Sequence, residues 1–538
     1  MTVTDVSRTT ARPKVLLAGI LLAVVVVPTG VSGTGVALPH IAADLSSSPA
    51  MLQWVVNGFN LTFAVFSLVA GSVADHLGRR RGLIVGALLF FGSAVLSALA
   101  PTLLILDIGR ALAGIGAAII FACSGALLAI TFDGAAAARA FALFGTAAGV
   151  GLGLGPTISS TAISLVGWPG IFWFNAAAIA ASGLLVVLSG VHDTPAHDAG
   201  KLDYRGAIAF AVSLTLVIAA VVQADSWGWG SAATLGTLAA GIALFAVFIR
   251  IQWTGDHPLL DIGLLRSPRL VGLLLVPVAG AVGFVTLLTY YPTFLNTVWQ
   301  LSAGETGLVM LLMTVPVILA PLVAGALHTR GVPVWIILGG SALFFVAGAA
   351  LLTTAGTDRD ILALVVPFLL LGTGFGLGVG LVDGQAIGSV PPERSGMVSG
   401  LVSTVRLGSE ALVVAAFASA LTTGVGAQVR SQLPDSLDPA ARDTVVDQVV
   451  TGEIGSVDPS LNAELLRNSF SDGLIPLLWA LAVISLVLAV AITVLLRRPA
   501  ATAPSAPQGS ADVPAEPNLD PVEPIAPLPA ASTEEIRR

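Results

Sequence analysis

The sequence predicts an all-α integral membrane protein with fourteen transmembrane helices. Its 538 residues are 55% hydrophobic and only 10% charged, whereas an average soluble domain is about 25% charged. So few charges cannot cover a water-soluble surface, which excludes soluble multidomain enzymes, disordered proteins and nucleic-acid binders. The single cysteine excludes an internal disulfide framework and any multi-cysteine metal site.

Each predicted span is an apolar run long enough to cross a bilayer. A helix that rises about 1.5 Å per residue needs roughly 20 such residues to cross about 30 Å of hydrocarbon. These runs are too long and continuous for barrel strands, so we expect helices that satisfy their own backbone hydrogen bonds. They lie at about 15–39, 52–73, 82–99, 102–124, 140–163, 168–189, 206–223, 234–251, 270–290, 305–328, 334–355, 361–383, 396–422 and 473–496.

The basic residues predict that both termini lie in the cytoplasm. With a cytoplasmic N-terminus, eighteen of the 24 lysines and arginines fall in cytoplasmic segments, as the positive-inside rule requires. The first span follows a polar segment and has no small-residue cleavage site after it, so we expect it to be retained. Only Lys14 and Lys201 are lysines, a usage that indicates a high-GC bacterial genome and hence a bacterial plasma membrane.

The order of spans and polar segments predicts two pseudo-symmetric six-helix halves on either side of a central helix pair. We expect residues 423–472 to form a long extracellular loop with a short helix near 443–450. The loop would act as a solvated cap or would gather the ligand. A proline- and alanine-rich tail is expected to be disordered. The predicted parts are a cytoplasmic N-terminus (1–14), the first half (15–189), a cytoplasmic linker (190–205), the helix pair (206–251), the second half (252–498) and the cytoplasmic tail (499–538).

Motifs of soluble energy coupling are absent from the sequence. Without GxxxxGK[ST] we expect no ATP-driven pump and no cofactor, so that transport would be driven by the transmembrane proton gradient. The six histidines lack metal-ligand spacing, and no metal site is predicted. The glycine-rich string at 374–380 lies inside a span, where small residues favour close helix packing over dinucleotide binding.

The string GSVADHLGRRRGL at 71–83 joins the second and third spans. It resembles the signature of the major facilitator superfamily at the same place. In that family the acid and the arginines are thought to hold the two halves together on the cytoplasmic side. The resemblance assigns this conformational-switch role to Gly71, Asp75, Gly78, Arg79 and Arg80.

Three further strings agree with that resemblance and narrow it to one family of transporters within the superfamily. RALAGIGAA at 110–118 resembles the span-four signature, and GLGLGPTISS at 151–160 resembles the antiporter signature, in which Gly151, Gly155 and Pro156 would shape a bent, tightly packed helix. VALPHIAADL at 36–45 is similar to the start of the fourteen-span drug:proton antiporters. Members of that family commonly carry an aspartate in span one where this sequence has Gly30, so the proton site is expected elsewhere.

Charged residues inside spans are the candidates for proton coupling, because a charge at mid-bilayer costs roughly 2.5–3.5 kcal/mol. Asp107 and Arg110 are three residues apart, and Arg406 and Glu410 four apart, so each pair shares a helix face. For both pairs two roles remain open: a static ion pair that holds helices together, or a role in proton coupling. In the second case Glu410 or Asp107 would carry the proton. Asp383, which closes the twelfth span, is a further candidate for proton coupling, although a place at the cytoplasmic interface is favoured for it.

Polar and aromatic side chains near the midplane are the candidates for lining a substrate cavity between the halves. They are Gln53, Asn57, Asn60, Asn175, Tyr290 and Tyr291. An apolar cavity with few charges favours a hydrophobic or amphipathic organic molecule over a sugar or an inorganic ion.

The resemblance implies a monomeric secondary transporter that exports a toxic organic compound, an antibiotic by expectation, in exchange for protons. Self-resistance in an antibiotic-producing bacterium would fit this role, and the expected partners are the substrate, protons and the lipid bilayer. The alternatives are an importer or a metabolite exporter without a role in drug resistance. A membrane-embedded enzyme would need a catalytic cluster at one face, and a sensor would need a large signalling domain; neither is found in the sequence.

Overall fold

The computed structural model describes residues 12–45, 49–191, 203–255, 258–357, 359–391, 394–434, 438–451 and 463–498. Every regular element in these ranges is a helix, and fourteen helices or helix runs are long and apolar enough to cross a membrane. The predicted fold class is therefore confirmed. The tail 499–538, the N-terminal residues 1–11 and most of the linker, 192–202, lie outside the described residues.

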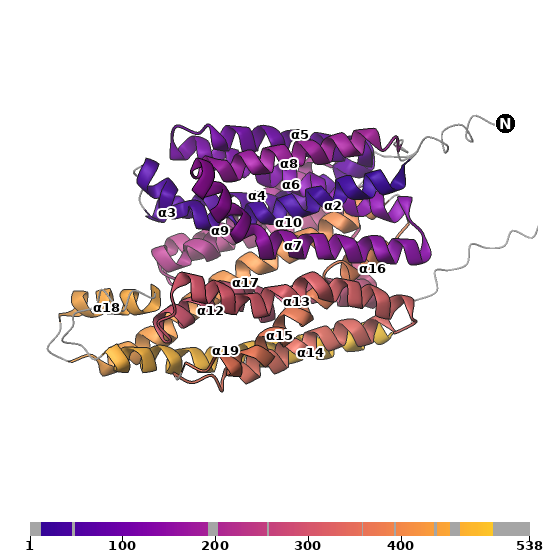
Figure 1. The fold of residues 1–538 in the computed structure, drawn as a ribbon. Helices are drawn as coiled ribbons and strands as arrows, with labels where there is room; N and C mark the ends of the chain where they lie inside the picture. Colours follow the sequence, from indigo (N-terminus) through magenta and orange to yellow (C-terminus); the bar gives the residue numbers. More distant parts are fainter. Residues whose placement is uncertain are drawn as a thin grey trace, which may run out of the picture. The chain divides into compact units, whose positions relative to one another are not determined.

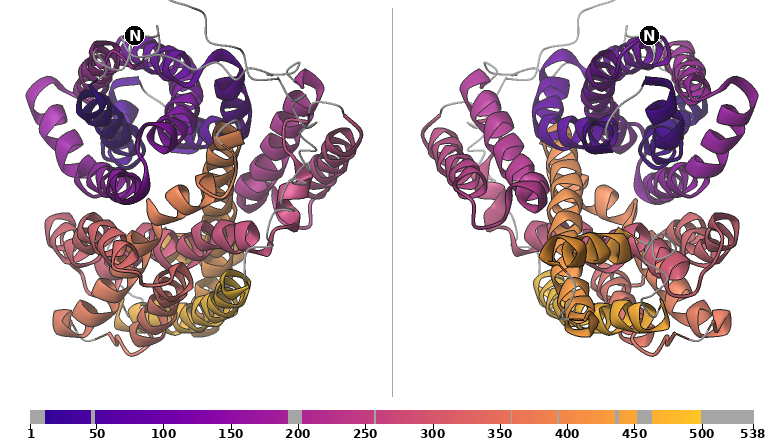
Figure 2. Two further views of the ribbon diagram at one scale, coloured as in Figure 1. Left: turned by 90° about the vertical axis from the view of Figure 1, so that its right-hand side faces the viewer. Right: turned by 90° about the vertical axis from the view of Figure 1, so that its left-hand side faces the viewer.

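The first six spans form one bundle, which we call the first bundle (Figures 1 and 2). Its first helix begins at a proline, whose missing N–H would have no partner there, and Thr102 caps the fourth span by accepting from the N–H of Ile105. The helices are α2 (Pro13–Ser32), α3 (Thr34–Leu45), α4 (Pro49–Leu77), α5 (Arg79–Ala98), α6 (Leu103–Thr131), α7 (Gly134–Val166) and α8 (Pro169–Leu188).

The last six spans form the second bundle, and the helix pair α9 (Tyr204–Trp227) and α10 (Ala232–Thr254) lies beside both bundles (Figure 2). A capping box of Ser302 and Glu305 starts the tenth span. The second bundle contains η1 (Ile262–Arg266), α11 (Pro268–Gly280), η2 (Ala281–Val285), α12 (Thr286–Thr297), α13 (Ala303–Thr329), α14 (Val334–Leu352), α15 (Ile361–Gly378), α16 (Leu381–Ile387), α17 (Ser395–Gln432), α18 (Pro439–Thr451) and α19 (Ala463–Arg497).

Three spans are interrupted, which the apolar runs alone did not predict. The first span breaks at Gly33 between α2 and α3, and the ninth contains one turn of π-helix, η2. The twelfth breaks between α15 and α16, where Gly380 has a φ of +79°. This left-handed conformation favours glycine, because it has no Cβ to clash with the backbone.

The predicted loop at 423–472 is largely helical in the described residues. Both neighbouring helices extend into it, since α17 continues to Gln432 and α19 starts at Ala463. The short helix expected at 443–450 is present as α18, whose Val446 and Val449 are buried. Arg430 of α17 forms an ion pair of 2.8 Å with Asp443 of α18, so this segment packs against the bundle.

Close packing between α4 and α6 depends on Gly114. A Cβ atom at this position would lie 2.0 Å from the Oγ1 atom of Thr62 and 2.4 Å from the carbonyl oxygen of Phe59. The Thr62 hydroxyl also donates to the carbonyl of Ala111 at 2.8 Å. Helices in a membrane associate through such close contacts and interhelical hydrogen bonds.

We therefore expect Gly114→Ala to destabilise the protein by about 1–3 kcal/mol, because overpacking forces the two helices apart. The measurement is the thermal unfolding midpoint of the purified protein in detergent. Gly92→Ala is the matched control, since a Cβ atom there meets nothing within 4 Å. Equal midpoints for the two variants would contradict the packing role of Gly114.

Candidate functional site

Asp75 connects the two bundles at one end of the molecule, which we call the Asp75 end. Its carboxylate accepts hydrogen bonds from the backbone N–H groups of Gly396, at 3.1 Å, and Met397, at 2.9 Å. These amides lie in the first turn of α17, where the helix dipole favours a negative charge. Arg79, one turn further along the chain, forms an ion pair of 3.1 Å with the same carboxylate. The predicted switch motif thus meets the second bundle through its acid.

Helices α4 and α17 are in backbone contact beside Asp75. A Cβ atom at Gly71 would lie 2.2 Å from the carbonyl oxygen of Gly396, and one at Gly400 would lie 2.3 Å from that of Ser67. We call this line of contact between the bundles a seam. Further along it, the hydroxyl of Thr404 donates to the carbonyl of Ala64 at 3.2 Å. No side chain or substrate fits between these helices, so this seam is closed.

The other seam between the bundles is formed by α7 and α13, which lie side by side in Figure 1. A Cβ atom at Gly149 would lie 2.8 Å from the carbonyl oxygen of Val317. Nearer the Asp75 end, the break in the twelfth span meets α7, because a Cβ atom at Gly380 would lie 2.3 Å from the carbonyl oxygen of Phe141. Both seams are therefore closed toward the Asp75 end.

The remaining motif residues also pack helices. Gly78 has a φ of +96° and is the N-cap of α5, and Arg80 donates to the carbonyl of Val187 at 3.1 Å. In the antiporter motif, a Cβ atom at Gly151 would lie 2.2 Å from the carbonyl oxygen of Val25, and α7 continues past Pro156. Gly155 makes a similar approach to the Oγ atom of Ser32, at 2.0 Å. Both glycines therefore hold α7 against α2 within the first bundle.

Arg110 is fully buried inside the first bundle, and it does not form the predicted pair with Asp107. Its Nε atom donates to the carbonyl of Val55 at 2.8 Å, and an Nη atom donates to the carbonyl of Gly30 at 3.0 Å. The ring of Phe59 lies 4.4 Å from the guanidinium carbon, a cation–π contact. Within the described part of the chain, Asp107 has no ion pair and its buried Oδ1 atom has no hydrogen-bond partner.

Arg406 pairs with Asp383, not with Glu410. The guanidinium Nη2 atom lies 2.7 Å from the Oδ2 atom of Asp383, and both side chains are largely buried. Asp383 lies in α16, just past the break in the twelfth span, and is only 4% exposed. The break in the twelfth span turns Asp383 toward α17, so that its side chain is enclosed by protein. Glu410 lies one turn along α17 from Arg406 and is half-buried, with no ion pair to any residue that the structure describes.

The predicted cavity residues fall into separate environments. Asn175 is buried beside Gly30, and its Oδ1 atom has no partner among the described residues. Asn57 and Asn60 are half-buried on α4. Tyr291 is 2% exposed and packs against Phe368, so it belongs to the core. Tyr290 is half-buried against Phe417, and the side chain of Gln53 lies outside the described residues.

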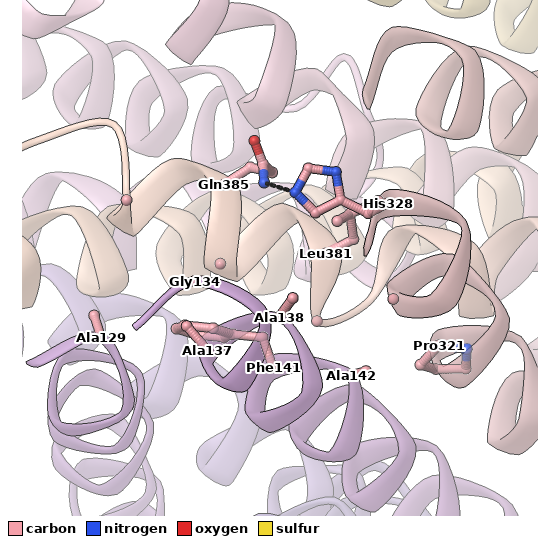
Figure 3. A pocket seen from close by; sticks show the side chains of 14 residues that line it. Ala129, Gly134, Ala137, Ala138, Phe141, Ala142, Pro321, His328, Leu381 and Gln385 are labelled. Atoms are coloured by element: carbon pink, nitrogen blue, oxygen red, sulfur yellow. Dashed lines mark hydrogen bonds between the residues drawn. The ribbon is translucent and has the colours of Figure 1, made fainter. Parts of the chain in front are cut away.

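A cavity of about 160 Å³ lies at the Asp75 end, between the two bundles (Figure 3). None of the predicted substrate residues lines it. Its polar side chains are Gln385 of α16 and His328 of α13, which are joined by a hydrogen bond of 3.1 Å. In the described ranges, no group of three or more His, Cys, Asp or Glu side chains could hold a metal ion.

Sequence reasoning missed the two backbone amides that donate to Asp75, and it missed this cavity. The amides of Gly396 and Met397 are backbone groups, and the only sequence signal for them is the glycine in SGMV, which permits the approach of α4. His328 and Gln385 are 57 residues apart, and nothing in the sequence connects them.

Comparisons with known proteins agree with this fold. The sequence matches the Major Facilitator Superfamily over residues 20–414. It is 29% identical to the multidrug resistance protein Stp of Mycobacterium tuberculosis over 469 residues, 84% of this chain and 86% of Stp. It is 27% identical to the tetracenomycin C resistance and export protein of Streptomyces glaucescens over 402 residues, 74% of each chain.

Among solved structures, the proton:xylose symporter XylE has a similar fold. The TM-score is 0.59 at 15% sequence identity, and the alignment covers 88% of this chain and 94% of XylE. The sequence match extends from the first span into the thirteenth, and the fold is shared with a solved transporter of the family. The chain belongs to the major facilitator superfamily.

Proposed function

We propose that this protein exports a hydrophobic or amphipathic toxic compound, an antibiotic or a similar molecule, in exchange for protons. The names of the relatives, which include multidrug resistance and tetracenomycin C export proteins, support drug export. The low charge of the spans supports an apolar cargo. In this proposal the protein lies in the bacterial plasma membrane as a monomer, with both termini and the Asp75 end in the cytoplasm.

The proposed proton coupling rests on one arginine that pairs with one carboxylate and has a second carboxylate nearby. Arg406 now pairs with Asp383, and Glu410 lies one turn away on the same helix as the arginine. A proton that binds Asp383 removes its charge and releases Arg406. The arginine then pairs with Glu410, which must give up any proton that it holds. The exchange would link proton movement to a rotation of α17 against α16.

Asp75 supplies the conformational side of the mechanism. Transporters of this kind alternate by rocking one bundle against the other around a central site. The contacts of Asp75 with the first turn of α17 stabilise the arrangement that is closed at the Asp75 end. Since these contacts are only a few hydrogen bonds, the rocking motion can break them in each cycle.

We expect Glu410→Gln to reduce proton-driven export at least tenfold while leaving the protein level intact, because the amide cannot carry the proton. The measurement is uptake of a panel of hydrophobic antibiotics into inverted membrane vesicles, with and without a pH gradient. Glu464→Gln, on the exposed first turn of α19, is the control. Undiminished gradient-driven uptake by the Glu410 variant would reject its role, and uptake independent of the gradient would favour the importer or facilitator alternative.

We expect Asp75→Asn to open the Asp75 end more often. Losing a charge-assisted hydrogen bond costs about 1.5 kcal/mol, or roughly tenfold in the ratio of closed to open molecules. The reporter is Ser399→Cys, a site buried on α17, in a chain whose single, buried cysteine is replaced by Cys123→Ala. Its labelling rate by a hydrophilic maleimide should rise about tenfold.

The control for the Asp75 variant is Asp133→Asn, which removes an exposed acid next to α7 whose side chain caps no helix. A similar rise in labelling for both variants would show that net charge, and not the contact with α17, controls the opening.

A further inference from the structure

The cavity at the Asp75 end has walls from both bundles. Helices α6 and α7 of the first bundle contribute one side of it, and α13 and α16 of the second bundle contribute the other (Figure 3). If the bundles separate at this end, these walls separate with them. The cavity therefore exists only while the Asp75 end is closed, and anything that fills it favours that state.

The walls of the cavity are mostly apolar. One side is the ring of Phe141 with small side chains around it, and the opposite side is formed largely by Pro321 and Leu381. A space of about 150 Å³ is enough for a molecule the size of benzene, and this cavity, which is partly open to its surroundings, measures about 160 Å³. An aromatic ring placed here could meet the ring of Phe141 in an edge-to-face or offset arrangement.

The polar wall has a defined hydrogen-bonding pattern. Arg269 of α11 donates to the Oε1 atom of Gln385 at 3.0 Å, and a guanidinium can only donate. The carboxamide must then turn its Nε2 atom toward His328, which lies 3.1 Å away. A carboxamide nitrogen can only donate, so the Nε2 atom of His328 faces a donor. The lining contains no Asp, Glu, Lys or Arg side chain, which suits a neutral ligand with one polar group.

We propose that this cavity binds a small neutral molecule with a single aromatic ring and one hydroxyl-sized polar group, and that the bound molecule holds the two bundles closed at the Asp75 end. Such a ligand inhibits transport without being transported. The binding itself does not depend on the proposed export function; only its inhibitory consequence rests on that function. A ligand that favours one state shifts the equilibrium by the ratio of its affinities for the two states.

The test uses the full chain in lipid nanodiscs and 4-fluorophenol as the probe, with binding followed by ¹⁹F NMR. Ala138→Leu adds a side chain to the cavity wall, and Ala136→Leu adds the same side chain at an exposed position two residues away. We expect the affinity to fall at least tenfold in the Ala138 variant and to stay within twofold in the Ala136 variant. Equal binding by both variants, or none by the unmodified chain, would overturn the site. Ala137→Leu, which fills the cavity from the adjacent position, serves if the Ala138 variant does not fold.

The closing effect is measured separately by labelling of the Ser399→Cys reporter. We expect saturating 4-fluorophenol to slow labelling about fivefold in the reporter chain and to leave it unchanged when Ala138→Leu is added. Labelling that is equally fast with and without the probe would overturn the closing role. Neither readout needs transport, so a chain that binds the probe but exports nothing would reject the proposed function alone, and proton-driven export without probe binding would reject this inference alone.

Discussion

Asp75 places a negative charge on the first turn of a helix from the other bundle, and the contact at this end of the molecule is built around that interaction. Two apolar bundles gain little from the hydrophobic effect when they meet in lipid, because the lipid chains are as apolar as the helices. Their contact depends instead on van der Waals packing and interhelical hydrogen bonds. The glycines of α4 and α17 permit that packing by letting the two backbones touch.

A contact built from close packing and a few hydrogen bonds is both specific and reversible. Specificity comes from geometry, since the carboxylate of Asp75 must reach two adjacent amides while Arg79 holds it from the side. Reversibility comes from the small number of hydrogen bonds that cross the seam. A salt bridge buried between the bundles would be much harder to break in each cycle, and the described residues place the buried ion pair of Arg406 and Asp383 within the second bundle.

The sequence was sufficient to predict the helices but not their interruptions. Apolar length is a one-dimensional property, so the fourteen spans could be predicted from it, and α18 lies where a short helix was expected in the loop. The break at Gly380 could not be predicted, because it depends on the approach of α7 to the backbone there. The same limit applies to the extension of α17 to Gln432, which packs against α18.

The charged residues inside the spans could be read from the sequence, but their partners could not. The spacing of Arg406 and Glu410 predicted that they share a helix face, but the partner of Arg406 comes from a different helix, across the break in the twelfth span. Likewise, Arg110 is satisfied by carbonyls of α2 and α4, which are present at every residue and leave no mark in the sequence. Partners that belong to the backbone, or to a distant helix, require the three-dimensional fold.

The helix pair has a consequence for how molecules dissolved in the bilayer could reach the space between the bundles. Helix α9 packs against both α4 and α17, and Trp229, in the turn between α9 and α10, donates a hydrogen bond to Ser419 of α17. The pair therefore shields the seam that Asp75 closes from surrounding lipid, whereas in the described part of the chain no such pair covers the seam between α7 and α13. Lipid can therefore approach the seam between α7 and α13 directly, whereas on the opposite flank it meets the helix pair first.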